Sequence, residues 1–452
     1  MVMEFVRKKS IVRAAELFST PCLPPLLLLL LFLLCFPCNL TAAESLNSSA
    51  GLRKKVSALR LARIQRHLNT INKPAVRSIQ SPDGDTIDCV HGHRQPALDH
   101  PLLKNHTIQR VAPKKPSFSG RWPAIVAGNS TASRRAWQSW HHAGRCPKGT
   151  IPIRRSSVDD VLRAKSLFHY GKKQNRRRPP ITAGTAATRT ANAPDIVSGN
   201  GHEHAIAYTG TEQELYGAKA TINVWDPSIQ VGNEFSLSQI WVLSGSFDGS
   251  DLNSIEAGWQ VSPELYGDSR PGCFTYWTSD AYQVTGCYNL LCSGFVQTNN
   301  KIAIGASISP ISSYDATQFD ITILIWKDPK VGNWWMSFGD SMLVGYWPAE
   351  LFTHLTDRAT MVEWGGEVVN TRSDGRHTST QMGSGRFAGD GFARASYFRD
   401  LEVVDADNSL SPVESVTTLA ENPDCYDIKS SSNADWGTYF YYGGPGSNSK
   451  CL

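Results

Sequence analysis

The chain has 452 residues, of which 41% are hydrophobic, 19% charged and 10% aromatic, which excludes a collagen, a coiled coil and a wholly disordered protein. The net charge of +5 conceals an asymmetry: residues 1–199 hold 32 Lys and Arg against 10 Asp and Glu, whereas residues 200–452 hold 13 against 30. No nucleic-acid-binding signature accompanies the basic half, which argues against nucleic acid as a partner. We expect the basic half to dock on the acidic half by complementary charge.

The N-terminus has the pattern of a secretory signal peptide, which we assign to residues 1–43. Basic residues from Arg7 to Arg13 precede an apolar run at 26–36, and small residues follow at 41–43. The apolar run is shorter than the ~20 residues that a membrane-spanning helix needs. We therefore expect a protein secreted to the extracellular space or cell wall, without a membrane partner once the signal is removed.

Seven of the ten cysteines follow the signal peptide, and in an oxidising compartment most of them should pair. The spacing of Cys287 and Cys292 suits a local disulfide. Cys425 and Cys451 could tie down the C-terminus, and Cys89 and Cys146 both lie in the basic half and could pair there. Cys273 is left over, either free and buried or available for an intermolecular bond. Sequons permit N-glycosylation in the basic half, at Asn47, Asn105 and Asn129.

After the signal, the basic half predicts two helices and then a linker. Residues 51–70 form a basic helical pattern whose apolar stripe includes Ile64 and Leu68, and residues 159–170 predict a second, short helix. The stretch 171–199 is rich in Lys, Arg, Ala and Thr and contains a Pro-Pro pair. Such a stretch cannot bury a core, so we interpret it as an exposed processing linker.

The acidic half predicts many short strands separated by turns. Apolar or alternating runs, rich in β-branched and aromatic residues, occur at 218–225, 237–243, 301–309 and 321–326. Only residues 348–359 are expected to be helical. This pattern over ~250 residues favours an all-β sandwich or barrel.

The chemistry that the sequence offers is glutamate among glycine and tryptophan. No nucleophile elbow, HExxH pair or P-loop occurs, and a metal pair at His202 and His204 is a weak hypothesis, so we expect neither cofactor nor metal. Glu256 lies in the strand-like run Ile-Glu-Ala-Gly-Trp, and Glu367 ends the run Trp-Gly-Gly-Glu. Two such carboxylates, if they faced each other, would separate into one acid and one base. The sequence alone does not show that they meet.

From His204 onward the chain resembles the neprosin family of plant secreted proteins, also described as the DUF239 domain. The matching stretches include 255–261, 265–268, 274–278, 285–292, 364–368 and 441–446. The basic half resembles the activation peptide of that family, at 72–74, 83–90, 100–102 and 146–155. The resemblance divides the chain into a signal peptide (1–43), an activation peptide or prodomain (44–170), a basic linker (171–199) and a catalytic domain (200–452).

The resemblance implies an antiparallel two-sheet β-sandwich preceded by a smaller mixed prodomain. It also implies a glutamic endopeptidase that cuts after proline and uses two glutamates on the concave sheet. Glu256 matches the first glutamate, and we prefer Glu367 as the second. Glu363 is a close rival, since it shares a strand face with Glu367 unless a bulge intervenes, and Glu350 is a weaker one.

Three aromatic residues are candidates for a wall that stacks on the substrate proline, with core packing as the alternative role for each: Trp259, Tyr276 and Trp277. Proline-containing peptides or proteins are the expected partners, together with the chain's own prodomain as an intramolecular inhibitor. We expect the prodomain to leave at acid pH after self-cleavage at a linker proline (Pro179, Pro180 or Pro194). A basic-site protease acting at 176–178 is the rival.

Two other classes of function remain open at this point. Paired carboxylates on a sandwich rich in Trp and Tyr are also compatible with a glycoside hydrolase. The same fold without turnover would be an inactive cell-wall protein that binds carbohydrate or protein.

Overall fold

The computed structural model describes residues 56–118, 134–135, 137–173, 201–210, 213–246, 250–339, 342–372 and 375–452. The chain divides into two compact units, Met1–Ala58 and Leu59–Leu452, and the fold given below is that of the second. The proposed signal peptide, Asn47, Asn129 and the linker from residue 174 to 199 lie outside the described residues. Asn105 is described and exposed. Among the described residues, no helix is long and apolar enough to cross a membrane.

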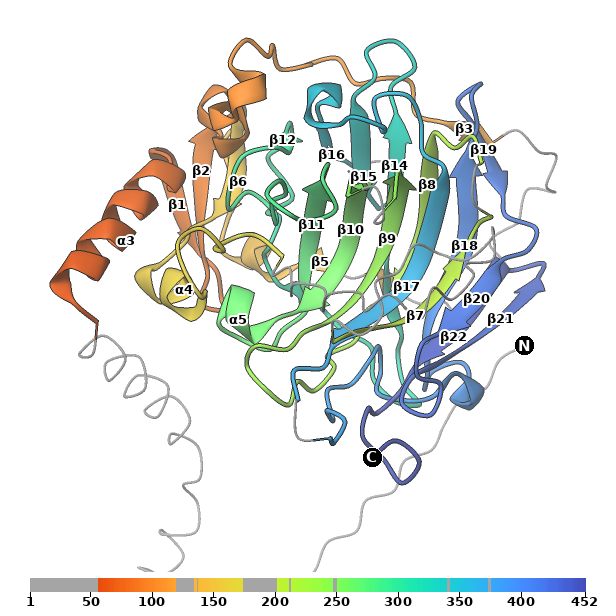
Figure 1. The fold of residues 1–452 in the computed structure, drawn as a ribbon. Helices are drawn as coiled ribbons and strands as arrows, with labels where there is room; N and C mark the ends of the chain where they lie inside the picture. The colour runs from red at the N-terminus through yellow and green to blue at the C-terminus, as the bar shows by residue number, and fades with distance from the viewer. Residues whose placement is uncertain are drawn as a thin grey trace, which may run out of the picture. The chain divides into compact units, whose positions relative to one another are not determined.

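The acidic half is an antiparallel β-sandwich, as expected, and its two main sheets are neighbouring layers in Figure 1. The first sheet has six strands, in the order β11 (Gly272–Thr278), β10 (Asn253–Val261), β9 (Ser236–Ser244), β17 (Met361–Val369), β7 (His202–Tyr208) and β20 (Thr417–Ala420). One face of this sheet contributes Ile240, Ile255 and Ala257 to a continuous apolar core. The other sheet supplies residues such as Ile222 and Ile323 to the same core.

The larger sheet has 11 strands. Its main path is β12 (Val296–Gln297), β16 (Met342–Trp347), β15 (Trp334–Phe338), β14 (Phe319–Lys327), β8 (Gly217–Asn223), β18 (Ser396–Val404), β19 (Ser409–Pro412) and β3 (Ser117–Phe118). Off this path, the hairpin of β21 (Asp427–Asn433) and β22 (Gly437–Gly443) pairs with β18, and β4 (Arg134–Arg135) pairs with β14. Strands β3 and β4 come from the basic half, so that half is joined to the sandwich by backbone pairing.

In its described residues, the basic half has its own small sheet and two helices, a mixed arrangement as expected. The sheet contains β1 (Ala75–Gln80), β2 (Thr86–His91) and β6 (Thr150–Arg154), and the helices are α3 (Ala58–Ile71) and α4 (Val158–Arg163). Short 3-10 turns are η1 (Gly92–Arg94), η2 (Pro96–Asp99), η3 (Pro101–Leu103) and η4 (Ser139–His142). A further strand, β5 (Trp137–Gln138), pairs with β13 (Ile308–Ser309) of the acidic half.

Three predicted elements differ from the structure. The helix expected at 348–359 is reduced to the turn η5 (Ala349–Leu351), because Oδ1 of Asn253 accepts the backbone N–H groups of Thr353, His354 and Leu355. The helix at 159–170 ends at Arg163, and in the run 301–309 only β13 is a strand. The short α5 (Pro263–Tyr266) and η6 (Ala388–Asp390) were not predicted.

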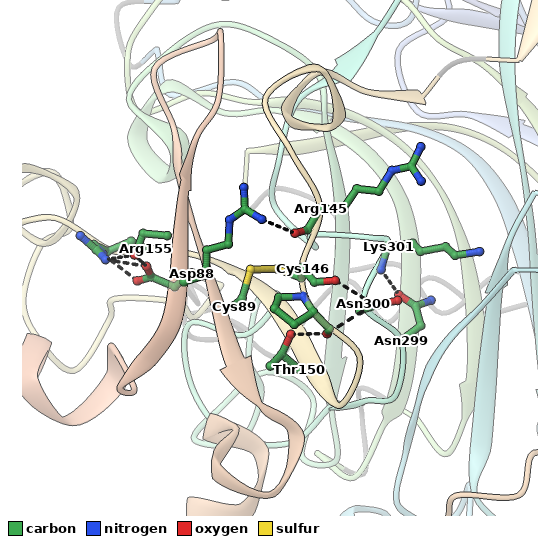
Figure 2. Close-up of a disulfide and its surroundings, with 12 residues drawn as sticks. Asp88, Cys89, Arg145, Cys146, Thr150, Arg155, Asn299, Asn300 and Lys301 are labelled. Atoms are coloured by element: carbon green, nitrogen blue, oxygen red, sulfur yellow. Dashed lines mark hydrogen bonds and ion pairs between the residues drawn. A yellow bond between two sulfur atoms is a disulfide. The ribbon is translucent and has the colours of Figure 1, made fainter.

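The three expected disulfides are present: Cys89 with Cys146, Cys287 with Cys292, and Cys425 with Cys451. Figure 2 shows the first disulfide, where Asn300 of the acidic half donates to the carbonyl oxygen of Cys146 at 2.9 Å. Cys273 is free and fully buried on β11, and burial raises the pKa of its thiol to about 12. A thiol at that depth does not reach a second chain, so the free and buried alternative holds.

Candidate active site

Glu256 and Glu367 lie on the same face of the six-stranded sheet, two strands apart. On the intervening strand β9, Trp241 is opposite Glu256 and Leu237 is opposite Glu367. Positions 237 and 241 differ by an even number, and side chains alternate along a strand, so both carboxylates point to one side. That side is opposite the face that packs in the sandwich core.

The row between the two glutamates consists of Gly258, Gln239 and Gly365. A Cβ at Gly258 would lie 1.9 Å from the carbonyl oxygen of Ser238, and one at Gly365 would lie 2.3 Å from that of Ala205. Both positions therefore need glycine, and Gln239 supplies the single side chain of this row. Pairing is continuous through Gly365, so no bulge separates the faces of positions 363 and 367.

The ammonium group of Lys173 lies within ion-pair distance of both carboxylates. Nζ of Lys173 lies 2.7 Å from Oε2 of Glu256 and 3.7 Å from Oε2 of Glu367. The side chain of Lys173 is 9% exposed, and those of the glutamates are 0% and 3% exposed. Lys173 belongs to the segment expected to be an exposed linker from residue 171. That expectation is wrong for 171–173, because Gly171 is buried and its carbonyl oxygen accepts the N–H of Tyr288 at 2.7 Å.

Glu256 is surrounded by uncharged donors in addition to Lys173. The hydroxyl of Tyr282 donates to its Oε1 at 2.7 Å, and that of Ser254 donates to the same oxygen at 3.1 Å. Nε2 of Gln239 donates to Oε2 at 3.0 Å. Burial, together with the charge of Glu256, raises the pKa of the Tyr282 hydroxyl well above its usual value, so Tyr282 remains a donor.

Glu367 has histidine neighbours. Its Oε1 lies 2.5 Å from Nδ1 of His202, and its Oε2 lies 4.0 Å from Nε2 of His204. Nδ1 of His204 in turn lies 2.6 Å from Oε2 of Glu421, just beyond β20. Burial raises the pKa of Glu367, but the charge of Lys173 and the hydrogen bond and charge of His202 outweigh it. The pKa of Glu367 therefore lies well below the usual range of a glutamate.

The other two candidate glutamates have different surroundings. Glu363 shares the face of Glu367 but lies four residues away, opposite Trp241 and Tyr208. Glu350 lies on η5, where its half-exposed side chain pairs with His106 at 3.4 Å. Of the three candidates for the second position, Glu367 is the one within ion-pair distance of the lysine that contacts Glu256.

Two of the three residues expected to form the aromatic wall do not face the site. Trp259 and Trp277 lie in the sandwich core, and Nε1 of Trp259 donates to the carbonyl oxygen of Asn223. Each is an odd number of residues from the position on its strand that faces the site, so the pleat directs it to the opposite face. Tyr276 is opposite Glu256 and does face the site, where its hydroxyl accepts the N–H of Lys173 at 3.2 Å.

Several site residues were not found from the sequence. Lys173 was assigned to the linker, and His202 and His204 were considered only as metal ligands. Gln239 had the signal of alternation along β9. Tyr282 and Tyr288 come from the loop after β11, where the stretch 285–292 carried the family resemblance but gave neither tyrosine a role in the site. Their rings pack on Tyr276, with centroids 5.9 Å and 4.5 Å away.

The fold and site together define an all-β protein with a buried carboxylate pair that its own N-terminal half covers. Residues 232–445 match the model of the Neprosin family, and residues 78–208 match that of the Neprosin activation peptide. The chain therefore belongs to the neprosin family and carries its activation peptide. Membership of this family supports a peptidase that is made with an activation peptide.

Among solved structures, the chain is similar to Scytalido-glutamic peptidase with a peptide-based transition-state analog (12% identity, TM-score 0.29, covering 54% of this chain and 98% of that chain). It is also similar to SCP-B, a member of the Eqolisin family of peptidases, in complex with the tripeptide Ala-Ile-His (12%, 0.28, 54% and 96%). A third similar chain is the Ruminococcus gnavus IT-sialidase CBM40 bound to α2,6 sialyllactose (12%, 0.19, 38% and 94%).

Proposed function

We propose that the protein is a secreted glutamic endopeptidase, made as a zymogen, that hydrolyses peptide bonds after proline at acid pH. The observation that carries this proposal is the single ammonium of Lys173 between the buried carboxylates of Glu256 and Glu367. A protein does not bury two acidic groups side by side without cost, since each loses solvation, so their retention needs a functional reason. The family match supports the same class of enzyme.

In the proposed mechanism, the two glutamates act as general base and general acid. Once Lys173 has left, two neighbouring carboxylates share one proton, because like charges at short range do not both ionise readily. The ionised carboxylate takes a proton from a water molecule, which attacks the scissile carbonyl carbon. The protonated one hydrogen-bonds the carbonyl oxygen and then donates to the leaving amine. This requirement for one retained proton is the reason to expect an acid pH optimum.

Latency is proposed to come from Lys173 and from the apolar cover around it. Lys173 places one positive charge against both carboxylates, and its side chain fills the space between them. The N-terminal half also buries apolar residues against the site face of the six-stranded sheet: Ile64, Leu68, Val161 and Tyr170 pack in one cluster with Tyr208, Leu237 and Trp241. Among the described residues, the part of the cover that lies on the site face is thus an apolar cluster, with Lys173 at the carboxylate pair.

Release is proposed to require acid pH and cleavage in the linker that follows Lys173. Protonation of the carboxylates removes the attraction for the lysine, and a cut between 174 and 199 removes the covalent tether. Self-cleavage after Pro179, Pro180 or Pro194 is preferred, and cleavage at the basic run 176–178 is the rival. N-terminal sequencing of the acid-matured protein distinguishes them, and a new N-terminus at Pro179 would favour the rival.

For the preference for proline, we propose that Tyr276, Tyr282 and Tyr288 form the stacking wall, in place of Trp259 and Trp277. The rings of Tyr282 and Tyr288 both pack on Tyr276, and the hydroxyl of Tyr282 donates to Glu256. Flat aromatic surfaces suit the rigid pyrrolidine ring.

The experiment that tests the function is an incubation of the secreted protein at about pH 3 with a mixture of proline-containing peptides. Products that end in proline, absent with Glu256→Gln and Glu367→Gln but present with the matched control Glu363→Gln, would support the proposal. If no products form after confirmed loss of the N-terminal half, the protein is instead an inactive binding protein on the same sandwich.

A further inference from the structure

The two glutamates of the site differ in the groups that remain when Lys173 leaves. Among the described residues, Lys173 is the one cationic group within ion-pair distance of Glu256. Glu367 retains His202 at 2.5 Å and His204 at 4.0 Å. The hydrogen bond and charge of His202 and the charge of His204 lower the pKa of Glu367, so the basic groups that remain in the opened site lie on the side of Glu367.

The hydrogen bonds are distributed with the same asymmetry. Both oxygens of Glu256 accept bonds from uncharged donors: Tyr282 and Ser254 on Oε1, and Gln239 on Oε2. In Glu367, Oε1 is engaged by His202, whereas the buried Oε2 accepts no hydrogen bond from the described residues. Glu367 therefore presents one oxygen with its lone pairs available, held in place by the partner of the other oxygen.

The two histidines are themselves oriented by neighbours on the same sheet. They lie two residues apart on β7, so the pleat directs both to the site face. His204 is opposite Glu367 in the register, and Glu421 contacts its Nδ1 and its backbone N–H. The chain Glu421–His204 thus directs Nε2 toward Glu367, in the manner of a carboxylate that orients a histidine. The pKa of His204 is raised: its burial opposes this, but Glu421, Glu367 and Glu363 outweigh burial.

We propose that His202 and His204 are positioning residues that keep Glu367 ionised, so that Glu367 is the general base and Glu256 the general acid. This inference rests on the proposed function and assigns the two roles that the paired carboxylates left open. The titratable groups around the carboxylate pair come from five places, with Lys173 added before activation. They are Glu363 on the strand of Glu367, His202 and His204 on β7, Glu256 on β10, Glu421 after β20, and Tyr276, Tyr282 and Tyr288 from β11 and its loop.

In the proposed step, protons and bonds are exchanged among water, the substrate and the two glutamates. Oε2 of Glu367 takes one proton from water, and the water oxygen forms the new bond to the carbonyl carbon. Glu256 gives its proton to the amine nitrogen as the carbon–nitrogen bond breaks. One water molecule is consumed, and the proton on Glu367 returns to Glu256 through solvent, which restores the starting state.

The test is the pH dependence of kcat/KM for the acid-matured enzyme on a proline-containing peptide. In His202→Gln, we expect the acid limb of the profile to move to higher pH by about one unit, because Glu367 loses the hydrogen bond and charge of His202 that lower its pKa. His204→Gln should move it in the same direction by less, since Nε2 is farther away, and His202→Lys, which keeps a cation, should restore it partly. His354→Gln is the matched control, because His354 pairs with Asp251 on an exposed surface.

The outcomes separate this inference from the proposed function. An unmoved acid limb in both His202→Gln and His204→Gln, or a loss of turnover that is equal at every pH, overturns the positioning role while peptide hydrolysis stands. Absence of hydrolysis by the matured wild-type protein, or turnover that survives in Glu256→Gln and Glu367→Gln, overturns the proposed function itself. If His202→Gln fails to fold, the profile of His204→Gln decides alone.

Discussion

The two faces of strand β10 differ in what they require of their residues. One face places Ile255, Ala257 and Trp259 in the apolar core between the sheets. The other face presents Glu256 and Gly258 to the carboxylate site. The core face requires apolar side chains that fill the space between the sheets. The site face requires a carboxylate at position 256 and no side chain at position 258. Neighbours in the sequence therefore belong to unrelated environments, and closeness to a catalytic candidate along the chain does not place a residue in the site.

The largest expected effect is on kcat, in variants of the two glutamates on the site face. Glu256→Gln and Glu367→Gln should each lower kcat by about a thousandfold or more, because a neutral amide neither accepts the water proton nor donates one. Glu363→Gln, on the same strand and face as Glu367, should change kcat by less than about tenfold. Initial rates on one proline-containing peptide give all three values. A comparable loss in Glu363→Gln would move the second catalytic position to residue 363.

The core face predicts an effect on stability. Trp259→Ala should lower the free energy of unfolding by about 3–5 kcal/mol, since it removes a fully buried ring and leaves a cavity. Tyr276→Ala, on the site face, should instead alter the preference for proline over alanine before the cleaved bond. Denaturant unfolding and paired peptide assays measure the two effects. If Trp259→Ala changed the preference and Tyr276→Ala did not, the assignment of the two faces would be reversed.

A smaller effect is expected where the N-terminal half meets the site. Lys173→Met in the full-length protein should raise the rate of cleavage of a short peptide before maturation by about tenfold, because the carboxylates lose their shared counter-ion. Lys172→Met is the matched control, since Nζ of Lys172 contacts the backbone carbonyl oxygen of Val284 and not the pair. Equal rates in the two variants would mean that the apolar cover alone maintains latency.

The smallest expected effect is that of pH on the association between the N-terminal half and the catalytic domain. Lys173 and His202 hold the pKa of Glu367 below its usual value, so the ionised carboxylate stabilises the covered state. This contribution is fully present above the ordinary glutamate pKa of about 4.3 and is lost progressively as the pH falls from there through the depressed pKa of the covered state. In a protein cleaved in the linker, the two parts should elute together at neutral pH and separate at about pH 3 in size-exclusion chromatography. Elution together at both pH values, with intact folding, would contradict this role.

Local patterns predicted the class of fold because they depend on neighbouring residues. Alternation and β-branched content correctly located β8, β9 and β14, and the positions of the cysteines along the chain predicted all three disulfides. The helix expected at 348–359 failed for a non-local reason, since Asn253, about 100 residues away, accepts the backbone N–H groups of that segment. The role of Asn253 has no local signature.

The sequence by itself determined that this is a β-rich chain with a basic N-terminal half, three disulfides and glutamates set among glycines. Glu256 and Glu367 were candidates because glycine allows close backbone approach, a property of residues near in the chain. Only the tertiary structure decided that both carboxylates meet at Lys173, that Trp259 belongs to the core, and that His202 and His204 lie beside Glu367. These facts depend on strand order and register, which bring together residues up to 194 positions apart, as between Lys173 and Glu367. No local pattern specifies a distance of that kind.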